Sequence, residues 1–300
     1  MKKDEIKTKT AMITIAGRPN VGKSTLTNAL IGEKVAIVTP KPQTTRNRIC
    51  AILNSADTQL VLIDTPGFHK PRTRLGDYMV KVVRESVADV DAVVLMVEPI
   101  PSAGQEEIEL IARIRDTKTP AVLVINKIDT VLKQELLDVI SAYSVLHDFE
   151  AIVPISAKKG DGTKELLDIL KNFAIPGPKL FPEDTVTDQP EAQVCAEIVR
   201  EKLLICLDKE IPHGTAVEVT KFSERENEII DLDVTIYCEK ASHKGIIIGK
   251  NGEMLKKIGT LARSDIERFM GTKVFLQTWI KVKENWRDKA GLLKNFGYKA

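Results

Sequence analysis

One segment of the chain reads Gly17-Arg18-Pro19-Asn20-Val21-Gly22-Lys23-Ser24, after an apolar run over residues 11–16 and before a helical pattern over residues 23–31. This G-x-x-x-x-G-K-[ST] spacing between a strand and a helix is typical of a loop that binds nucleotide phosphates. The two glycines carry no Cβ, so backbone N–H groups can approach a phosphate, and the positive end of the new helix adds to their field. We expect Lys23 to reach the β- and γ-phosphates and Ser24 to ligate Mg²⁺. A Gly/Ser-rich turn without a ligand is the alternative, and the loop alone does not identify the base.

The rest of the amino-terminal half repeats this alternation of buried strand and helix. Its apolar runs are nearly continuous in Val, Ile and Leu, which is typical of parallel strands covered on both faces. The runs lie at residues 11–16, 60–63, 92–97, 121–125 and 152–155, and the helical patterns lie at residues 23–31, 78–87, 105–116, 134–149 and 163–173. The sequence therefore predicts a doubly wound, mostly parallel α/β sheet, in which ligands bind beyond the carboxyl ends of the strands.

Three short motifs follow three of these strands. Asp64-Thr65-Pro66-Gly67 follows the second run, where the carboxylate suits the Mg²⁺ shell and the Gly67 N–H can meet a γ-phosphate. Asn126-Lys127-Ile128-Asp129 follows the fourth run, and an Asp carboxylate there can accept the ring and exocyclic N–H groups of guanine, which adenine lacks in that arrangement. Ser156-Ala157-Lys158 follows the fifth run, where the Ala157 N–H can donate to the guanine carbonyl. Each motif alone is usually a polar loop, but their order after successive strands predicts a guanine-nucleotide site.

A proline- and threonine-rich segment over residues 39–46 lies between the first helix and the second apolar run. It ends in Gln43-Thr44-Thr45-Arg46 and lacks periodicity, so we expect a mobile loop. A Thr hydroxyl from this loop can close on Mg²⁺ when a γ-phosphate is bound, which is the switch of guanine-nucleotide proteins. We take Ser24, Thr45 and Asp64 as the Mg²⁺ ligands. A second loop over residues 68–76 is the predicted companion switch.

The carboxy-terminal part reads as a second domain. Three prolines and a glycine within residues 175–184 end the helical pattern, so we expect an extended linker over residues 177–189 between domains at residues 1–176 and 190–300. The net charge of +2 hides a reversal, because residues 181–239 hold 5 Lys/Arg against 15 Asp/Glu and residues 240–300 hold 14 against 5. Such a reversal indicates a nucleic-acid or anionic surface more often than a solvated face.

A second glycine loop, Gly249-Lys250-Asn251-Gly252, lies in the basic stretch. Its glycines let the backbone approach a phosphodiester chain and Lys250 supplies charge, which is the RNA clamp of KH domains. G-x-x-G alone mostly means a turn, but an isoleucine run precedes this one and a Lys-rich helical pattern follows it. The predicted RNA-binding residues are Ile247, Ile248, Gly249, Lys250, Asn251, Gly252, Lys256 and Lys257. The expected order of helix, strand, strand, helix, helix, strand resembles a type II KH domain, a smaller α+β fold.

Taken together, these motifs resemble the Era branch of the translation-factor class of P-loop GTPases. The details that carry the resemblance are Pro19-Asn20, Gln43-Thr44-Thr45-Arg46 and Asp64-Thr65-Pro66-Gly67, and the KH-like half extends it to the whole chain. The resemblance implies an enzyme that hydrolyses GTP with Mg²⁺. It implies slow intrinsic hydrolysis, because Phe68 stands where many small GTPases have a water-orienting glutamine. It also implies that Asn20 can bind a K⁺ that replaces an arginine finger, although an ordinary loop role for Asn20 is equally open.

The resemblance further implies a partner and a role. The expected ligand of the KH domain is the 3′ end of small-subunit (16S) ribosomal RNA, and the expected role is maturation and assembly of the 30S subunit. Alternatives from other classes are a non-enzymatic RNA chaperone and a membrane-surface GTPase switch in cell-cycle signalling. A P-loop ATPase is disfavoured because Asp129 selects guanine.

Composition limits the remaining possibilities. At 300 residues, with 43% hydrophobic and 29% charged residues, the chain has the composition of a soluble globular protein with two domains. No apolar run is long enough for a transmembrane helix, and the polar, Lys-rich residues 1–9 do not predict a secretory signal. The four cysteines show no C-x-x-C spacing and are expected to be reduced thiols. We therefore expect a cytoplasmic monomer, with peripheral association at the inner face of the cell membrane as a further possibility.

Overall fold

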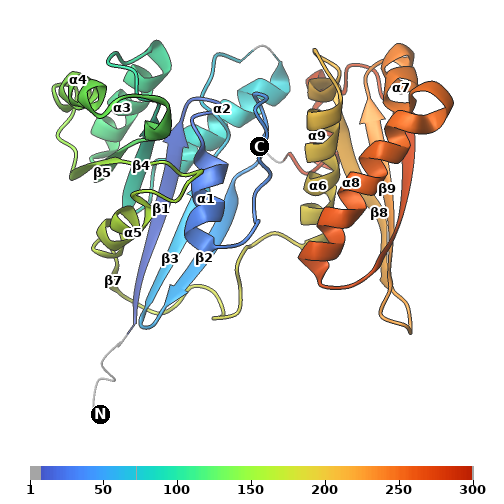
Figure 1. The fold of residues 1–300 in the computed structure, drawn as a ribbon, viewed down its shortest axis with the longest axis horizontal. Helices are drawn as coiled ribbons and strands as arrows, with labels where there is room; N and C mark the ends of the chain where they lie inside the picture. Colours follow the sequence, from blue (N-terminus) through green and yellow to red (C-terminus); the bar gives the residue numbers. More distant parts are fainter. Residues whose placement is uncertain (1–7, 72, 299–300) are drawn as a thin grey trace. The chain divides into compact units, whose positions relative to one another are not determined.

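The computed structural model describes residues 8–71 and 73–298, and Figure 1 shows their fold. Contacts between residues divide the chain into two compact units. The first unit ends at Asp188 and the second begins at Gln189, while two earlier segments, Ile37–Thr44 and Pro71–Tyr78, group with the second unit. The outer ends of the two predicted domains, residues 1–7 and 299–300, lie outside the described residues.

The first unit is built on a 7-stranded sheet in the order β2-β3-β1-β4-β5-β6, with β7 beside β1. The strands are β1 (Lys9–Gly17), β2 (Ile49–Ser55), β3 (Thr58–Asp64), β4 (Ala92–Val97), β5 (Ala121–Ile125), β6 (Ala151–Pro154) and β7 (Ile175–Pro176). β2 runs antiparallel to β3 and β7 antiparallel to β1, and the other pairs are parallel. Every residue of β3, β4 and β5 is buried, because helices cover both faces of the sheet.

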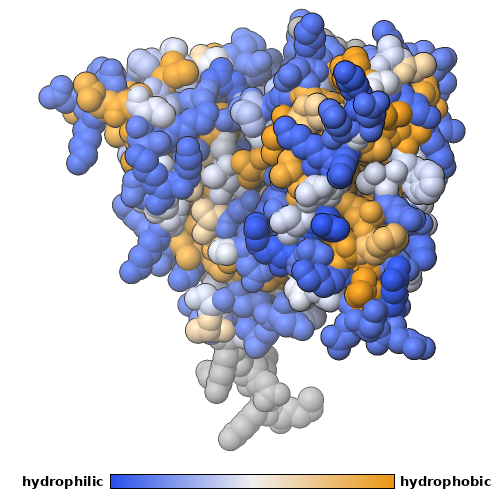
Figure 2. All heavy atoms as spheres, turned by 45° about the vertical axis from the view of Figure 1, so that its right-hand side comes forward, coloured by the Kyte–Doolittle hydropathy of each residue, from blue (hydrophilic) through white to orange (hydrophobic). Residues whose placement is uncertain are grey.

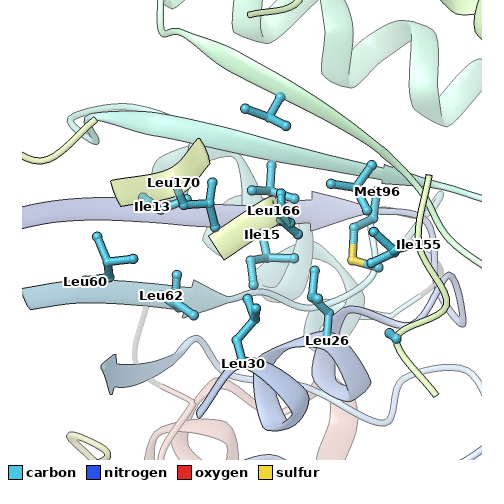
Figure 3. Close-up of a cluster of buried hydrophobic side chains, with 14 of the residues drawn as sticks. Ile13, Ile15, Leu26, Leu30, Leu60, Leu62, Met96, Ile155, Leu166 and Leu170 are labelled. Carbon is cyan, nitrogen blue, oxygen red and sulfur yellow. The ribbon is translucent and has the colours of Figure 1, made fainter. Parts of the chain in front are cut away.

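Two groups of helices form these covering layers. The helices are α1 (Lys23–Ile31), α2 (Arg74–Ser86), α3 (Gln105–Thr117), α4 (Lys133–Ser144) and α5 (Thr163–Lys171), and a short turn η1 (Ile128–Thr130) follows β5. Leu26 of α1 and Leu166 of α5 pack together over one face of the sheet (Figure 3). Val83 of α2, Leu110 of α3 and Val139 of α4 belong to the core cluster of the other face. Each such side chain contributes about 2 kcal/mol by burial, so both layers hold the strand ends in place.

The second unit is a smaller α+β fold with a three-stranded sheet in the order β10-β9-β8. Its elements are α6 (Glu191–Cys206), β8 (Ala216–Glu224), β9 (Ile230–Cys238), α7 (Ala241–Ile248), α8 (Glu253–Met270), β10 (Val274–Val282) and α9 (Ala290–Asn295), with short turns η2 (Pro212–Gly214), η3 (Lys250–Gly252) and η4 (Trp286–Asp288). β9 pairs parallel with β10 and antiparallel with β8. Leu232 and Val234 of β9 share a core with Val199 of α6 and Ile258 of α8. The predicted order of helix, strand, strand, helix, helix, strand is present.

The linker between the predicted domains lies against the first sheet. β7 pairs with β1, and the Ile52 N–H of β2 donates to the carbonyl of Val186 at 2.9 Å. Thr187 forms an isolated antiparallel bridge with Ala51 of the same strand. Residues 175–188 are therefore fixed to the sheet through backbone hydrogen bonds, and the change of unit falls immediately after them.

The predicted α/β class is confirmed, with local differences that include the end of α4 at Ser144, where the predicted helical pattern reached residue 149. All five predicted strands of the first unit are present, but β2 and β7 were not predicted. β2 forms a hairpin with β3 through a tight turn in which Ala56 adopts φ 49°. α2 begins at Arg74, so the loop after β3 is shorter than the predicted span of residues 68–76.

Candidate functional site

The loop between β1 and α1 is closely surrounded by other backbone segments. Gly17 has φ 152° and Gly22 has φ 105°, both in the region that favours glycine. A Cβ on Gly22 would lie 2.3 Å from Nδ2 of Asn126, and one on Gly17 would lie 2.4 Å from the carbonyl oxygen of Met96. The packing of the protein itself therefore requires glycine at both positions.

Lys23 opens α1 and is 6% exposed. Its Nζ donates to the carbonyl oxygens of Gly17 at 3.1 Å and Arg18 at 2.8 Å. Burial lowers the pKa of Lys23 to about 8, and the nearby carboxylate of Asp64 partly offsets this. A phosphate in place of the two carbonyls would supply the full countercharge that a buried ammonium needs.

Three oxygen-bearing side chains converge at the end of the phosphate loop. The Ser24 hydroxyl donates to Oδ2 of Asp64 at 2.6 Å and lies 2.8 Å from the hydroxyl of Thr45. Asp64 is fully buried, and its Oδ1 finds no hydrogen-bond partner among the described residues. Burial raises the pKa of Asp64 to about 6, with hydrogen bonds and Lys23 acting in the opposite direction. Two hydroxyls and a carboxylate with an unused oxygen fit a hard divalent cation such as Mg²⁺, directly or through its waters.

The segment after β3 is tied to the phosphate loop by its backbone. The Thr65 hydroxyl donates to the carbonyl of Ile15 at 2.8 Å, and the Phe68 N–H donates to the carbonyl of Gly17 at 3.1 Å. A Cβ on Gly67 would lie 2.6 Å from Cα of Pro19, so the two loops touch. The Phe68 ring is 5% exposed and packs in the core cluster that includes α2 and α3. It therefore offers no polar atom to an attacking water.

The two base-recognition motifs meet each other and the phosphate loop. The Asn126 amide donates to the carbonyl of Val21 at 2.7 Å and accepts from the Ala157 N–H at 2.9 Å. The Ser156 hydroxyl donates to Oδ1 of Asp129 at 2.7 Å, and this bond lowers the pKa of Asp129. Asp129 is thus held as a carboxylate on the exposed rim. The Ala157 N–H, predicted to meet a guanine carbonyl, is engaged by Asn126 in this structure.

Residues around the phosphate loop include an ion network that the sequence analysis missed. Glu98 follows β4 and accepts from Lys127 Nζ at 2.5 Å. Its other carboxylate oxygen lies 3.5 Å from the guanidinium of Arg18. Arg18 also pairs with Glu107 of α3 at 2.7 Å, and Glu107 is 1% exposed. The rule that located the other motifs, inspecting residues just after each strand, would have drawn attention to Glu98.

The predicted switch segment divides between the two units. Thr45 and Arg46 belong to the first unit, whereas Gln43 and Thr44 belong to the second. Within the second unit, the guanidinium of Arg200 donates to the carbonyl of Gln43 at 3.4 Å and to that of Thr44. The buried Arg200 is another residue that sequence reasoning missed, because nothing in the spacing of α6 marks it.

Two further predicted residues of the nucleotide site lie at its exposed surface. Asn20 is exposed at the tip of the phosphate loop with φ 65°, and Lys158 is exposed after β6. Their predicted roles, in K⁺ binding and in guanine recognition respectively, stay predictions.

The second glycine loop joins α7 to α8 and has an unusual backbone. Gly249, Asn251 and Gly252 have φ of 75°, 51° and 79°. A Cβ on Gly249 would lie 2.7 Å from Cβ of Met254, whereas one on Gly252 would have nothing within 4 Å. Lys250 is exposed at the tip. With three positive φ values in four residues, the backbone makes a tight turn that is open at Gly252 and carries the positive charge of Lys250.

The side chains around this loop differ in exposure. Ile247 is completely buried and belongs to the core of the second unit. Its side chain anchors α7 and faces the core in this structure, so a direct role of Ile247 in RNA binding stays a prediction. Ile246, which was not chosen, is 50% exposed. Ile248 is partly buried, and Lys256 and Lys257 are exposed on α8; their roles in RNA binding stay predictions.

On the face shown in Figure 2, hydrophobic side chains gather in several patches between hydrophilic ones. Among the exposed aromatic side chains of the second unit are those of Trp279, which is 57% exposed, and Phe275, which is 48% exposed, both on β10. Across the described part of the chain, we find no helix with the length and apolarity needed to cross a bilayer.

Comparison with known families covers both units. A family model described as 50S ribosome-binding GTPase matches residues 12–127, and one described as KH domain matches residues 210–287. GTPase Era of Ruminiclostridium cellulolyticum is 51% identical over 291 residues, which span 97% of this chain and 98% of that protein. GTPase Era of Alkaliphilus metalliredigens is 50% identical over 291 residues, spanning 97% and 99%.

Solved structures give the same correspondence along the chain. A structure of Era in complex with MgGDPNP and nucleotides 1506–1542 of 16S ribosomal RNA matches with a TM-score of 0.93 and 35% identity, covering 98% of this chain and 100% of that one. A variant of Aquifex aeolicus Era bound to GDP·AlF4⁻ matches with a TM-score of 0.94, 35% identity and the same coverage.

Proposed function

The chain belongs to the Era family of GTPases and is a GTP-hydrolysing enzyme, and we propose that it uses GTP to control how its second unit binds the 3′ end of small-subunit ribosomal RNA. One observation carries the proposal. A single chain holds a full set of guanine-nucleotide loops and, in a separate unit, a G-x-x-G loop followed by a Lys-rich helix. The role that follows is in maturation and assembly of the 30S subunit, in the cytoplasm.

In the first unit, each loop has a distinct task toward GTP. The phosphate loop and Lys23 bind the phosphates, while Asp129 accepts the N–H groups of guanine. Ser24, Thr45 and Asp64 would hold Mg²⁺, which screens the phosphate charge and polarises the γ-phosphate. Support comes from the unused Asp64 oxygen and from the MgGDPNP in the related Era structure.

Hydrolysis by this site is expected to be slow without an activator. Phe68 is buried and apolar, so the protein lacks the usual side chain for orienting water at that position. Asn20 lies exposed in the phosphate loop and is our candidate for a K⁺ ligand. Equal turnover in NaCl and KCl would remove the K⁺ role and leave the GTPase assignment intact.

In the second unit, the G-x-x-G loop would bind the RNA backbone. The open backbone at Gly252 leaves room for a phosphodiester, and Lys250, Lys256 and Lys257 supply positive charge nearby. Ile246, rather than Ile247, presents apolar surface beside the loop. The related structure holds Era with nucleotides 1506–1542 of 16S ribosomal RNA, which identifies the class of RNA to test.

The deciding experiment measures binding of a fluorescent RNA of that sequence with GDPNP or GDP present. We expect tighter binding with GDPNP, and weaker binding of a scrambled RNA in both states. Lys250→Ala should weaken binding, whereas Lys164→Ala, an exposed lysine of α5, should not. Equal affinity in the two nucleotide states would contradict nucleotide control. Binding to anionic vesicles that RNA does not displace would favour the membrane-surface alternative.

A further inference from the structure

We propose that Glu98 is a positioning residue that ties the base-recognition loop to the phosphate loop and thereby slows the release of guanine nucleotides. The inference rests on the proposed guanine site. It uses residues of the first unit alone.

The topology of the sheet places Glu98 between the two loops. β4 lies between β1 and β5, and Gly17 of β1 is in register with Met96, while Val97 is in register with Ile125 of β5. Glu98 is the first residue after β4. Because parallel strands bring their carboxyl ends to one edge, its side chain lies where the phosphate loop and the Asn126–Asp129 loop both begin.

Each oxygen of the Glu98 carboxylate faces a cation from a different loop. Oε1 accepts from Nζ of Lys127 at 2.5 Å, and Oε2 lies 3.5 Å from the guanidinium of Arg18. These side chains are about one-third exposed, so the contacts are partly shielded from water. Charge-assisted hydrogen bonds of this kind are stronger than neutral ones.

Arg18 is itself held firmly from its other side. Its Nε lies 2.7 Å from Oε1 of Glu107, and Oε2 of Glu107 accepts the Gly104 N–H at 2.7 Å. Glu107 is 1% exposed, so both oxygens of a buried carboxylate are used. The network thus runs from the start of α3 through Arg18 and Glu98 to Lys127, and it anchors the lysine to a rigid element.

Lys127 lies between Asn126 and Asp129 of the base-recognition loop, and its own backbone is constrained at φ 64°. A lysine stem held along the base edge of the site would cover apolar surface of the purine while its ammonium pairs with Glu98. Removing the charge of Glu98 would leave two cations facing each other and free the Lys127 side chain. Loss of this orientation lets the nucleotide leave faster.

The test compares Glu98→Gln with Glu109→Gln, which removes the same charge from an exposed position on α3. Dissociation of a fluorescent GDP analogue should be about tenfold faster for Glu98→Gln and unchanged for Glu109→Gln, as expected for a partly exposed charged pair. Glu98→Asp should restore part of the slow release. Release at the wild-type rate from Glu98→Gln would overturn the inference.

A second arm separates positioning from general destabilisation. In a Lys127→Ala background, Glu98→Gln should change GDP release by less than about twofold, because coupled residues are not additive. An undiminished tenfold effect in that background would overturn the inference. If Glu98→Gln fails to fold, the wild-type protein is tested instead. Its GDP release should accelerate as the NaCl concentration rises to about 1 M, because salt screens such ion pairs. A release rate that does not depend on salt would count against the proposal.

The same assay distinguishes this inference from the proposed function. If the wild-type protein does not bind GDP, the guanine site itself is wrong and both fall. If it binds GDP tightly and Glu98→Gln releases it equally slowly, only the role of Glu98 falls.

Discussion

The phosphate loop of the first unit and the Gly249–Gly252 loop of the second unit both depend on a pair of glycines, but their surroundings differ. A Cβ on Gly22 would lie 2.3 Å from Asn126, whereas one on Gly252 would have nothing within 4 Å. The first loop is enclosed by neighbouring strands and loops, whereas the second is open at Gly252 and crowded only at Gly249, where a Cβ would lie 2.7 Å from that of Met254. Glycine in the enclosed loop serves the packing of the protein, while Gly252 serves the backbone turn and leaves space beside it.

The lysines of the two loops differ in the same way. Lys23 is 6% exposed and its pKa is lowered to about 8 by burial, while Lys250 is exposed. A buried cation depends on one well-placed anion, because the cost of removing it from water must be offset locally. An exposed cation contributes a modest, salt-dependent attraction that adds to that of its neighbours. We therefore expect the first loop to discriminate between ligands by the position of one anion, and the second loop to contribute mainly a general attraction for polyanions.

The largest expected effect tests how narrowly the enclosed site selects its base. Asp129→Asn replaces an acceptor with an amide, so the preference should move from guanosine to xanthosine nucleotides. The ratio of the two affinities should change by about 10⁴-fold, because unpaired polar groups in a binding site discriminate strongly. Competition of GDP and XDP against a fluorescent nucleotide measures the change. Wild-type binding of ATP as tight as that of GTP would remove the basis of this prediction.

The next effect tests whether the protein itself crowds the phosphate loop. Gly22→Ala should weaken GDP binding by roughly 100-fold, since the new Cβ displaces Asn126 and small misplacements are costly in such sites. Gly32→Ala is the matched control, because Gly32 has φ 82° and nothing within 4 Å of its Cβ position. It should cost about 1 kcal/mol in the free energy of unfolding without changing GDP affinity. Equal GDP affinity for Gly22→Ala and Gly32→Ala would contradict the idea that crowding around Gly22 controls nucleotide binding.

A smaller effect separates the two glycines of the open loop. Gly249→Ala should lower the free energy of unfolding more than Gly252→Ala, because its Cβ would lie 2.7 Å from that of Met254. Both variants should bind RNA about tenfold more weakly, Gly249→Ala through a displaced loop and Gly252→Ala through obstruction of the ligand. GTP hydrolysis without RNA should not change. Full RNA affinity in Gly252→Ala would show that the open side of the loop is not where the backbone of RNA binds.

The smallest effect concerns charge in the open loop. Lys250→Ala should reduce the slope of log affinity against log salt by about 1 and weaken all RNA sequences to a similar extent. Titrations of the 16S-derived RNA and of its scrambled counterpart, each at several KCl concentrations, measure both quantities. A loss confined to one RNA sequence would instead assign Lys250 a role in base recognition.

That the residues of the candidate nucleotide site come together could be predicted from the sequence, because its motifs combine fixed spacing with a position after a strand. Ser24 and Asp64 are 40 residues apart in the chain, yet Oγ of Ser24 lies 2.6 Å from Oδ2 of Asp64 because β1 and β3 are neighbours in the sheet. The hydrogen-bond partner of the Ala157 N–H was harder to predict, because whether this group donates to the base or to Asn126 depends on how two loops pack. Spacing alone carries no information about that choice.

The second unit shows the same limit for side-chain direction. Three consecutive isoleucines before Gly249 contain no periodicity, so nothing in the sequence says which one faces the core. Packing against α8 and β9 buries Ile247 completely and leaves Ile246 half exposed. β2 was missed for a related reason, since its hairpin turn has Ala56 at positive φ, where glycine or asparagine would have been the signal.

The segment that joins the units also protects an edge of the first sheet. β2 is the outermost strand, and the bridge between Ala51 and Thr187 covers part of its free side. A fragment cut after β7 would expose those N–H and C=O groups, and bare strand edges recruit strands from other molecules. A monodisperse version of the isolated enzyme half should therefore keep the residues up to Asp188, so that solubility and catalysis can be studied without self-association.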